Sequence, residues 1–305
     1  MTSLFYGGIE GGGTKFVCLI AAAPDQVVAE TVIPTTTPEE TLERVITFFR
    51  QPRPGVRLVA LGLAMFGPLE LNPSAPNYGS LLATPKPGWS GVPVVQRLQA
   101  ALGLPVGVDT DVNGALRAEC RWGAGRGYDP VVYLTVGTGI GGGAWVHGRP
   151  VHGLLHPEMG HLPLPVLPGD TFPGLCPFHG RCWEGLAAGP ALAARVGRPL
   201  EQVPPEDPLW DLAGQYLGLG IAALVCTLSP RRVILGGGVG QQPHVLARAR
   251  QALRAYLNGY LPRPELETAV AEFLVPPALG ARAGVLGAIA LAEEAARLAR
   301  TAAPG

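Results

Sequence analysis

The sequence predicts an α/β protein whose architecture is duplicated within one chain. Hydrophobic residues make up 47% of the 305 residues and charged residues only 15%, so the chain can bury a large core and is long enough for two domains. Apolar segments of strand length and of helix length alternate along it. Three glycine-rich turns follow predicted strands in both halves of the chain, and this recurrence indicates the duplication.

Two short strands joined by a glycine turn open the chain. Residues 4–9 and 16–22 are apolar, and Glu10-Gly-Gly-Gly-Thr-Lys15 stands between them. The turn predicts a β-hairpin whose glycines let the backbone approach another group closely. Its N–H groups, with Thr14 and Lys15, suit a polyphosphate, although a plain glycine hairpin explains the same residues. The spacing is not that of a Walker A loop.

The rest of the first half continues with alternating elements. Thr37 is a candidate N-cap for a helix that opens at Pro38. The glycine- and proline-rich segment 77–89 either borders a ligand cleft or lies on the surface. The other predicted elements are strands at 26–33, 56–64 and 104–108 and a short helix at 92–102.

Two aspartates stand at the end of the predicted strand 104–108. Asp109 and Asp111 precede a helix predicted over 115–122. Carboxylates at the C-terminal edge of a strand in an α/β sheet are well placed to meet a ligand. An aspartate in this position also caps a helix. We therefore expect one of the two to cap the helix and the other to be a functional acid.

The second half repeats the order of strand, glycine turn and strand. The turn Gly137–Gly143 separates strands predicted at 130–136 and 144–148, and a further turn, Gly236–Gly240, follows a strand that begins at 232. In a duplicated α/β architecture such turns would hold the phosphates and the adenosine of a nucleotide. Helices are predicted over 209–228, 244–256 and 282–300.

Residues 156–184 form a long loop with the composition of a metal site. Cys176, His179 and Cys182 are spaced three residues apart, and His161 precedes them. Zinc prefers four nitrogen or sulfur ligands in a tetrahedron, and the prolines and glycines of the loop disfavour regular structure. The loop predicts a metal clip, with an irregular loop carrying scattered thiols as the alternative.

Charge and hydropathy exclude several classes of partner. The chain carries 23 residues of each charge sign and has no basic run, which argues against nucleic acid or an anionic membrane as partner. No uninterrupted apolar stretch of membrane-spanning length is present, and the N-terminus lacks the pattern of a signal peptide. We expect a soluble, cytoplasmic protein.

Several of these motifs together resemble one family, the ROK family of sugar kinases. The resemblance covers essentially the whole chain, and the combination of GGIEGGGTKFVC, TPKPGW and CPFHG is most similar to bacterial fructokinases of that family. The motifs that carry it are Glu10–Lys15, Thr110–Asn113, Gly137–Gly141, His156–His161, Cys176–Gly185 and Gly236–Gly238.

The resemblance implies an actin-like ATPase (ribonuclease H-like) fold, with two similar α/β domains around a cleft. The small N-terminal domain would comprise residues 1–112 and the C-terminal helix 284–305. The large C-terminal domain would comprise residues 113–283 and contain the zinc-binding loop 156–184. The resemblance also suggests a homodimer.

The resemblance further implies that the protein transfers a phosphoryl group from Mg²⁺-ATP to fructose, giving fructose 6-phosphate, with mannose as a further substrate. Asp111 matches the general base. The positions matching the sugar site are Gly67, Thr110, Asn113, Glu158, His161 and Glu184. The positions matching the ATP site are Glu10, Gly12, Gly13, Thr14, Lys15, Gly137, Thr138, Gly139, Gly141, Gly189, Pro190, Gly236, Gly237 and Gly238. The ligands of a structural Zn²⁺ would be His161, Cys176, His179 and Cys182.

Two residues depart from the family pattern. Glu10 stands where the family commonly has Asp, and its longer side chain shifts a magnesium or phosphate contact. Thr110 stands where glucokinase-type members often have Asn, which weakens the case for glucose. The alternatives are a glucokinase or N-acetylhexosamine kinase of the same family, or a non-catalytic sugar-sensing regulator. The chain begins with its first predicted strand, so we expect no DNA-binding domain.

Overall fold

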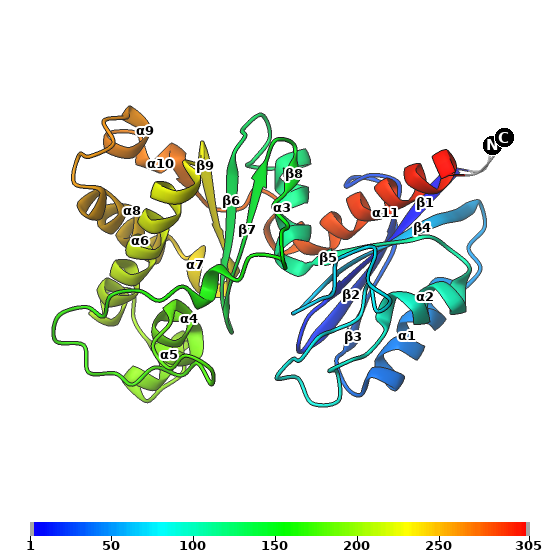
Figure 1. The fold of residues 1–305 in the computed structure, drawn as a ribbon, viewed down its shortest axis with the longest axis horizontal. Helices are drawn as coiled ribbons and strands as arrows, with labels where there is room; N and C mark the ends of the chain where they lie inside the picture. Colours follow the sequence, from blue (N-terminus) through cyan, green and yellow to red (C-terminus); the bar gives the residue numbers. More distant parts are fainter. Residues whose placement is uncertain (1–2, 303–305) are drawn as a thin grey trace. The chain divides into compact units, whose positions relative to one another are not determined.

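The computed structural model describes residues 3–302, and their contacts divide the chain into two units (Figure 1). Unit 1 is made of the described residues of Met1–Glu119, His152–His156 and Ala281–Gly305, and unit 2 of Cys120–Val151 and Pro157–Gly280. Each unit contains one five-stranded mixed sheet with helices packed on it.

The sheet of unit 1 has the strand order β3-β2-β1-β4-β5. The first three strands form an antiparallel meander, and β4 and β5 join β1 in parallel. The strands predicted from the sequence are confirmed within a few residues. Their bounds are β1 (Ser3–Gly11), β2 (Lys15–Ala21), β3 (Val27–Pro34), β4 (Val56–Met65) and β5 (Val106–Thr110).

The sheet of unit 2 repeats this topology. Read from β8, its order is β8-β7-β6-β9-β10, with the same antiparallel meander and the same two parallel additions. The duplication predicted from the recurring glycine turns is confirmed. The bounds are β6 (Val131–Val136), β7 (Ile140–Val146), β8 (Arg149–Pro150), β9 (Arg232–Gly236) and β10 (Leu274–Val275).

Unit 1 carries helices on both faces of its sheet. Thr37 caps the first helix as predicted, since its hydroxyl accepts a hydrogen bond from the Glu40 N–H. The buried side chains of that helix, among them Val45 and Phe49, pack on one sheet face. The helices are α1 (Pro38–Arg50), α2 (Val94–Leu102) and α11 (Ala283–Ala302), with α3 (Asp111–Trp122) continuing from unit 1 into unit 2.

A row of glycines brings α11 directly onto the sheet. Gly8 on β1, Gly62 on β4 and Gly107 on β5 pair with one another in register. A Cβ atom added to Gly62 would lie 1.8 Å from the Ala288 carbonyl oxygen of α11. The helix backbone therefore rests on the strands with no side chains between them.

Unit 2 is built around α6 (Leu209–Leu228), which packs along α8 (Pro243–Leu257). Gly218 lets α8 approach α6, since a Cβ added to it would lie 2.4 Å from the Cβ of Ala252. Gly220 makes room for Trp183, whose ring would lie 2.4 Å from an added Cβ. The remaining helices are α4 (Trp183–Ala187), α5 (Gly189–Val196), α7 (Gly237–Gly240), α9 (Pro264–Glu267) and α10 (Val270–Phe273), with 3₁₀ turns η1 (Met159–His161), η2 (Leu200–Gln202) and η3 (Gly280–Arg282).

Within residues 3–302, α6 is the one helix long and apolar enough to cross a membrane by length and composition. Over half of its apolar window is buried inside the protein. Large side chains of α6, such as Tyr216 and Leu217, lie in the main hydrophobic core of unit 2. Its apolar composition is that of a core helix.

The structure corrects two predicted boundaries. Strand β7 begins at Ile140, so Gly141, Gly142 and Gly143 lie in the strand and not in the turn. An added Cβ at Gly142 would lie 2.7 Å from the sulfur and 2.8 Å from the Cβ of Met159, so the glycine lets η1 pack closely on the strand. The helix expected over 115–122 already begins at Asp111.

Candidate functional site

The junction of β5 and α3 places the predicted general base in unit 1. Asp111 is the first residue of α3, and its Oδ1 accepts a hydrogen bond of 2.8 Å from the Val112 N–H. The Thr110 hydroxyl accepts the Asn113 N–H at 3.2 Å, which is the bond of an N-cap residue. The expectation that one of the aspartates caps the helix is wrong, because the threonine between them takes that role.

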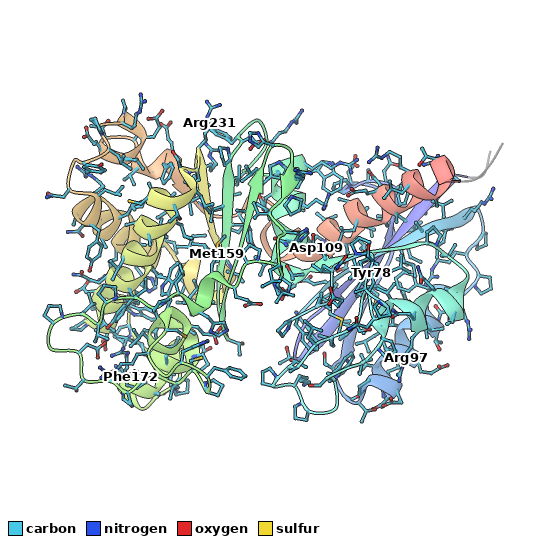
Figure 2. The ribbon with its side chains drawn as sticks, in the orientation of Figure 1. Tyr78, Arg97, Asp109, Met159, Phe172 and Arg231 are labelled. Atoms are coloured by element: carbon cyan, nitrogen blue, oxygen red, sulfur yellow. The ribbon has the colours of Figure 1, made fainter. Side chains whose placement is uncertain are left out.

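Asp109 is the buried centre of a polar network. Its side chain is 2% exposed, and its Oδ1 accepts hydrogen bonds from the Thr110 N–H and Asn113 Nδ2, both at 2.8 Å. Arg117 lies 3.9 Å from its other oxygen and pairs with Glu294 at 2.7 Å. Tyr78, labelled with Asp109 in Figure 2, has its pKa raised by burial and then by the charge of Asp109.

Asn113 is buried with one of its polar atoms unused. Its Nδ2 donates to Asp109, and its Oδ1 has no hydrogen-bond partner among residues 3–302. A buried carbonyl oxygen without a partner costs about 1–3 kcal/mol. This cost is removed when a ligand hydroxyl donates to that oxygen, which fits the predicted sugar contact.

Glu10 lies near Asp111 and beside the N-terminus of α11. A Cβ added to Gly284 would lie 2.3 Å from the Glu10 carboxylate, and the Val285 N–H donates a hydrogen bond to it. Burial, followed by the charge of Asp111, raises the pKa of Glu10 to about 7, against the opposing charge of Lys15. Burial also raises the pKa of Asp111. Unit 1 thus brings two acids together in a setting that favours protonation of one of them.

The first glycine turn of unit 1 is closed by its own backbone and by Thr35. The Gly12 N–H donates to the Lys15 carbonyl at 2.9 Å, and the Thr35 hydroxyl donates to the Gly12 carbonyl at 2.7 Å. Gly13, Thr14 and Lys15 are exposed. Three of the predicted phosphate-binding residues are therefore exposed on a turn that hydrogen bonds close.

Unit 2 brings its own predicted nucleotide-binding residues together. A Cβ added to Gly137 would lie 3.8 Å from the Gly238 nitrogen, and the Gly189 N–H donates to the Gly137 carbonyl at 2.8 Å. The two glycine turns and the start of α5, where Pro190 follows, form one cluster in which Thr138 and Gly238 are exposed. Unit 2 thus places three of its predicted nucleotide-binding segments next to one another.

Glu184, predicted to contact the sugar, holds the Gly137–Gly139 turn. Its Oε2 accepts the Ile140 N–H at 2.9 Å and lies 2.6 Å from where a Cβ of Gly139 would stand. Of the other predicted sugar contacts, Glu158 is exposed just before η1, and Gly67 follows β4 in unit 1.

The four predicted zinc ligands converge in unit 2. The ligand atoms of His161, Cys176, His179 and Cys182 all lie within 4.8 Å of one another. Individual separations are 3.5 Å from Cys176 Sγ to His179 Nδ1, 3.7 Å from Cys176 Sγ to His161 Nδ1, and 3.5 Å from Cys182 Sγ to His161 Nδ1. Zinc bonds of about 2.0–2.3 Å in a tetrahedron give ligand separations of about 3.5 Å. The cluster is compatible with a structural zinc ion.

The backbone of the loop shapes the cluster. Cys176 and Gly180 exchange two backbone hydrogen bonds, at 2.9 and 3.2 Å, so His179 stands at the tip of a tight turn. Burial, together with the neighbouring Cys176, raises the pKa of the Cys182 thiol to about 11. Binding of a metal by this thiol releases its proton, so affinity rises with pH.

A second anchor of the 156–184 loop was missed from the sequence. Arg195 of α5 makes two hydrogen bonds of 2.8 Å to the two carboxylate oxygens of Asp170, and the Tyr216 hydroxyl donates to one of them at 2.5 Å. Arg195 also stacks on Phe172, labelled in Figure 2. These bonds hold the pKa of Asp170 well below its usual range. An Asp in a loop and an Arg on a helix carry no sequence signal of their pairing.

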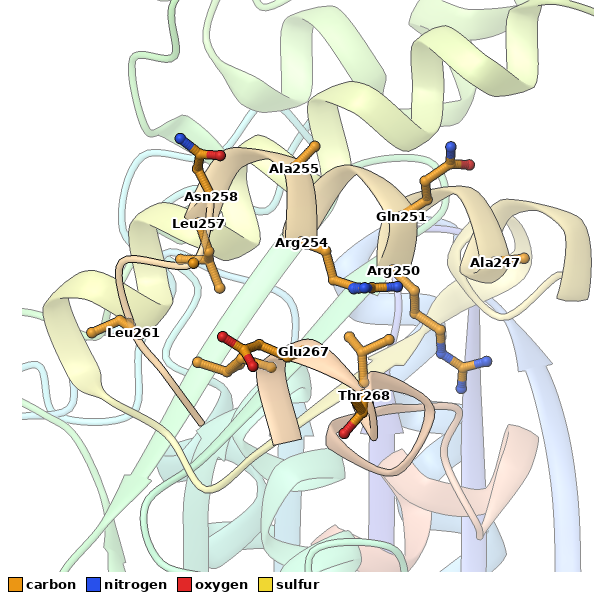
Figure 3. Close-up of a pocket in the computed structure, with 13 residues that line it drawn as sticks. Ala247, Arg250, Gln251, Arg254, Ala255, Leu257, Asn258, Leu261, Glu267 and Thr268 are labelled. Atoms are coloured by element: carbon orange, nitrogen blue, oxygen red, sulfur yellow. The ribbon is translucent and has the colours of Figure 1, made fainter. Parts of the chain in front are cut away.

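A large pocket in unit 2 lies away from every predicted site residue. Its volume is about 800 Å³, and it lies between α8 and the α9–α10 segment (Figure 3). Arg254 and Glu267 are among its polar residues, while Arg250 donates to the Leu274 carbonyl. None of the residues predicted from the sequence for the sugar, ATP or zinc sites lines this pocket.

Comparison with known proteins assigns the chain to a family. The model of the ROK family matches residues 6–295. The chain belongs to the ROK family. A fructokinase from Zymomonas mobilis is 42% identical over 94% of this chain and 96% of its own length.

Two solved structures of ROK proteins share the fold. The ROK hexokinase from Thermus thermophilus has a TM-score of 0.75 at 31% identity, covering 96% of this chain and 99% of that one. A ROK glucokinase from Streptomyces griseus in complex with glucose and AMPPNP has a TM-score of 0.74 at 26% identity, covering 95% and 99%. The predicted actin-like ATPase fold class is confirmed.

The Glu10→Gln substitution should stabilise the ligand-free protein more at pH 8 than at pH 5.5. The pKa of Glu10 is about 7 in the folded protein against an ordinary value of 4.5. Between these values the unfolded chain loses the proton while the folded chain keeps it, so stability falls as pH rises. Above pH 7 the charged Glu10 carboxylate lowers the free energy of unfolding by its full amount, on the order of 3 kcal/mol. Glutamine removes the charge and keeps an oxygen for the Val285 N–H.

The measurement is the difference in Tm between variant and parent protein at the two pH values. Glu43→Gln, on the exposed face of α1, is the matched control and should leave Tm unchanged at both. If the Tm gain of Glu10→Gln over the parent protein is smaller at pH 8 than at pH 5.5, the pKa of Glu10 is not raised.

Proposed function

We propose that this ROK protein is an ATP-dependent fructokinase that forms fructose 6-phosphate. The observation that carries the proposal is 42% sequence identity to a fructokinase over 94% of the chain. An acid at the start of α3 and the buried Asn113 Oδ1, which has no hydrogen-bond partner among residues 3–302, support it. The compared glucokinase is 26% identical, so the similarity favours fructose over glucose. Mannose is proposed as a further substrate.

Asp111 is proposed as the general base. It is the first residue of α3, and the Val112 N–H holds its carboxylate at the helix N-terminus, where it would accept the proton of a sugar hydroxyl. Thr110, Asn113 and Gly67 are proposed sugar contacts of unit 1, and Glu158, His161 and Glu184 those of unit 2. Asn113 Oδ1 supports this, because a sugar hydroxyl would supply the donor that this oxygen needs.

ATP is proposed to bind through the glycine turns of both units. Phosphoryl transfer depends mainly on alignment and on neutralising charge. Gly12, Gly13, Thr14 and Lys15 would contact phosphate in unit 1. In unit 2 the contacts would come from Gly137, Thr138, Gly139, Gly141, Gly189, Pro190, Gly236, Gly237 and Gly238. Mg²⁺ would supply positive charge to the phosphates, and we propose Glu10 as an acid that would hold it.

Zinc is proposed to be structural. His161, Cys176, His179 and Cys182 supply four ligands, which leaves no open position for water, so the ion would brace the loop and not act on the substrate. The loop so braced contains both Glu158 and Glu184.

We further propose a cytoplasmic homodimer with no nucleic-acid or membrane partner. The proposed domains are 1–112 with the helix 284–305, and 113–283 with the zinc loop. Equal numbers of acidic and basic residues support the absence of a nucleic-acid partner. Light scattering of the purified protein tests the dimer.

The sugar is tested with Mg²⁺-ATP and a panel of fructose, mannose, glucose and N-acetylmannosamine. We expect the highest kcat/KM with fructose and phosphorylation at carbon 6, read by NMR of the product. If kcat/KM is higher with glucose or N-acetylmannosamine, that sugar and not fructose is the substrate. Sugar binding with no turnover of any member would favour the regulator.

The Asp111→Asn substitution should lower kcat by about 10²–10⁴-fold, because the amide cannot accept the hydroxyl proton. Fructose affinity, measured by calorimetry, should stay within a few-fold, since the amide keeps its polar contacts. Asp25→Asn, at an exposed turn, is the matched control. A kcat near that of the parent protein would remove Asp111 from the role of base.

Metal analysis of protein purified without chelator should find about one zinc per chain. Cys182→Ser should lose most of this zinc and lower Tm, because the metal links the two ends of the loop. Cys226→Ser, at an exposed position, is the control and should retain the metal. Less than about one-tenth of a zinc per chain in the parent protein would rule out the site.

A further inference from the structure

One five-residue segment of unit 1 lies in the sequence between two stretches that belong to unit 2. His152–His156 belongs to unit 1, although Val151 before it and Pro157 after it belong to unit 2. The segment (here the histidine segment) contributes two of the chain's six histidines. Neither His152 nor His156 has a role in the proposed chemistry or the proposed zinc site.

His152 contacts the network that orients Asn113. Its Nε2 lies 3.1 Å from Asp109 Oδ1 and 3.1 Å from Asn113 Nδ2. An ionised Asp109 can only accept hydrogen bonds, so the His152 Nε2–H donates to its Oδ1, as Asn113 Nδ2 does at 2.8 Å. The network of Asp109 then sets the amide so that its Oδ1 is left for a ligand.

His156 acts on the loop after β4. Its ring is buried, and its Nε2 accepts the Leu69 N–H at 3.1 Å. A Cβ added to Gly67 would lie 3.4 Å from the same ring. The imidazole therefore packs on Gly67, the second proposed sugar contact of unit 1, and fixes the peptide two residues beyond it.

We propose that His152 and His156 are positioning residues for the sugar, His152 through Asp109 and Asn113, and His156 through the Gly67–Leu69 loop. Neither histidine need touch the substrate. The inference rests on the proposed function, since it assigns both residues to the same sugar site. One short segment thereby sets two separate sugar contacts, and only Pro157 separates it in the sequence from Glu158.

The proposal is tested by steady-state kinetics of His152→Ala and His156→Ala. Loss of one positioned contact should raise the KM for fructose by about tenfold. The KM for ATP should stay within about twofold, because no proposed ATP contact bonds to either histidine. His152→Gln keeps an N–H donor for Asp109, and His156→Gln keeps an oxygen for the Leu69 N–H, so both should restore most of the affinity.

A double-mutant cycle separates positioning from general structural damage. If His152 acts through Asn113, then His152→Ala should change the KM for fructose little in an Asn113→Ala background. If the two substitutions instead raise the KM for fructose independently, so that their effects multiply in the double variant, His152 does not act through Asn113. His147→Asn is the control for loss of a histidine: His147 is exposed and has a φ of +52°, a conformation that asparagine tolerates.

The outcomes distinguish this inference from the function on which it rests. Parent protein that phosphorylates no sugar of the panel would overturn the proposed function. If the parent protein is active but both alanine variants keep its sugar KM, the positioning role is wrong. A rise in the KM values of sugar and ATP together, with a lowered Tm, would also overturn it. If an alanine variant does not fold, the KM for fructose of the matching glutamine variant is compared with that of the parent protein. A glutamine variant that folds but has a KM for fructose raised tenfold would overturn the proposal.

Discussion

The packing of α11 on the sheet of unit 1 is the constraint on which the candidate base depends. Gly8, Gly62 and Gly107 expose bare backbone across three strands, and the helix rests on that strip. The same helix meets α3 where a Cβ on Gly287 would lie 1.8 Å from the Gly114 carbonyl oxygen. Since α3 starts with Asp111, the position of that acid is set by backbone contacts that tolerate no side chain.

The close approach also explains the electrostatics of Glu10. Gly284 leaves room for its carboxylate at the first turn of α11, where the Val285 N–H can bond to it. The helix N-terminus stabilises a negative charge there. Burial and the nearby Asp111 oppose it and outweigh it, as the raised pKa shows. A cation beside the two carboxylates would offset this repulsion and lower both pKa values.

The sequence predicted the fold well because its signals are local. The strands of both meanders and the Thr37 cap follow from apolar runs and from residues next to them. Long-range partners were not predictable. Asp109 and Asp111 look alike in the sequence, yet one is 2% exposed inside a network completed by His152. Likewise, the glycines at 141–143 look like a turn, but they pair with β6, and Met159 packs on Gly142.

The zinc loop shows why motif reasoning covers only part of a site. Spacing identified Cys176, His179 and Cys182 because metal ligands must be close in space and these are close in sequence. The other anchor joins Asp170 to Arg195 and Tyr216, residues brought together only by the folding of α5 and α6 around the loop. A paired, nearly buried carboxylate costs several kcal/mol if its partner is removed. The Asp170 anchor therefore restrains the loop independently of any ion at the cysteines.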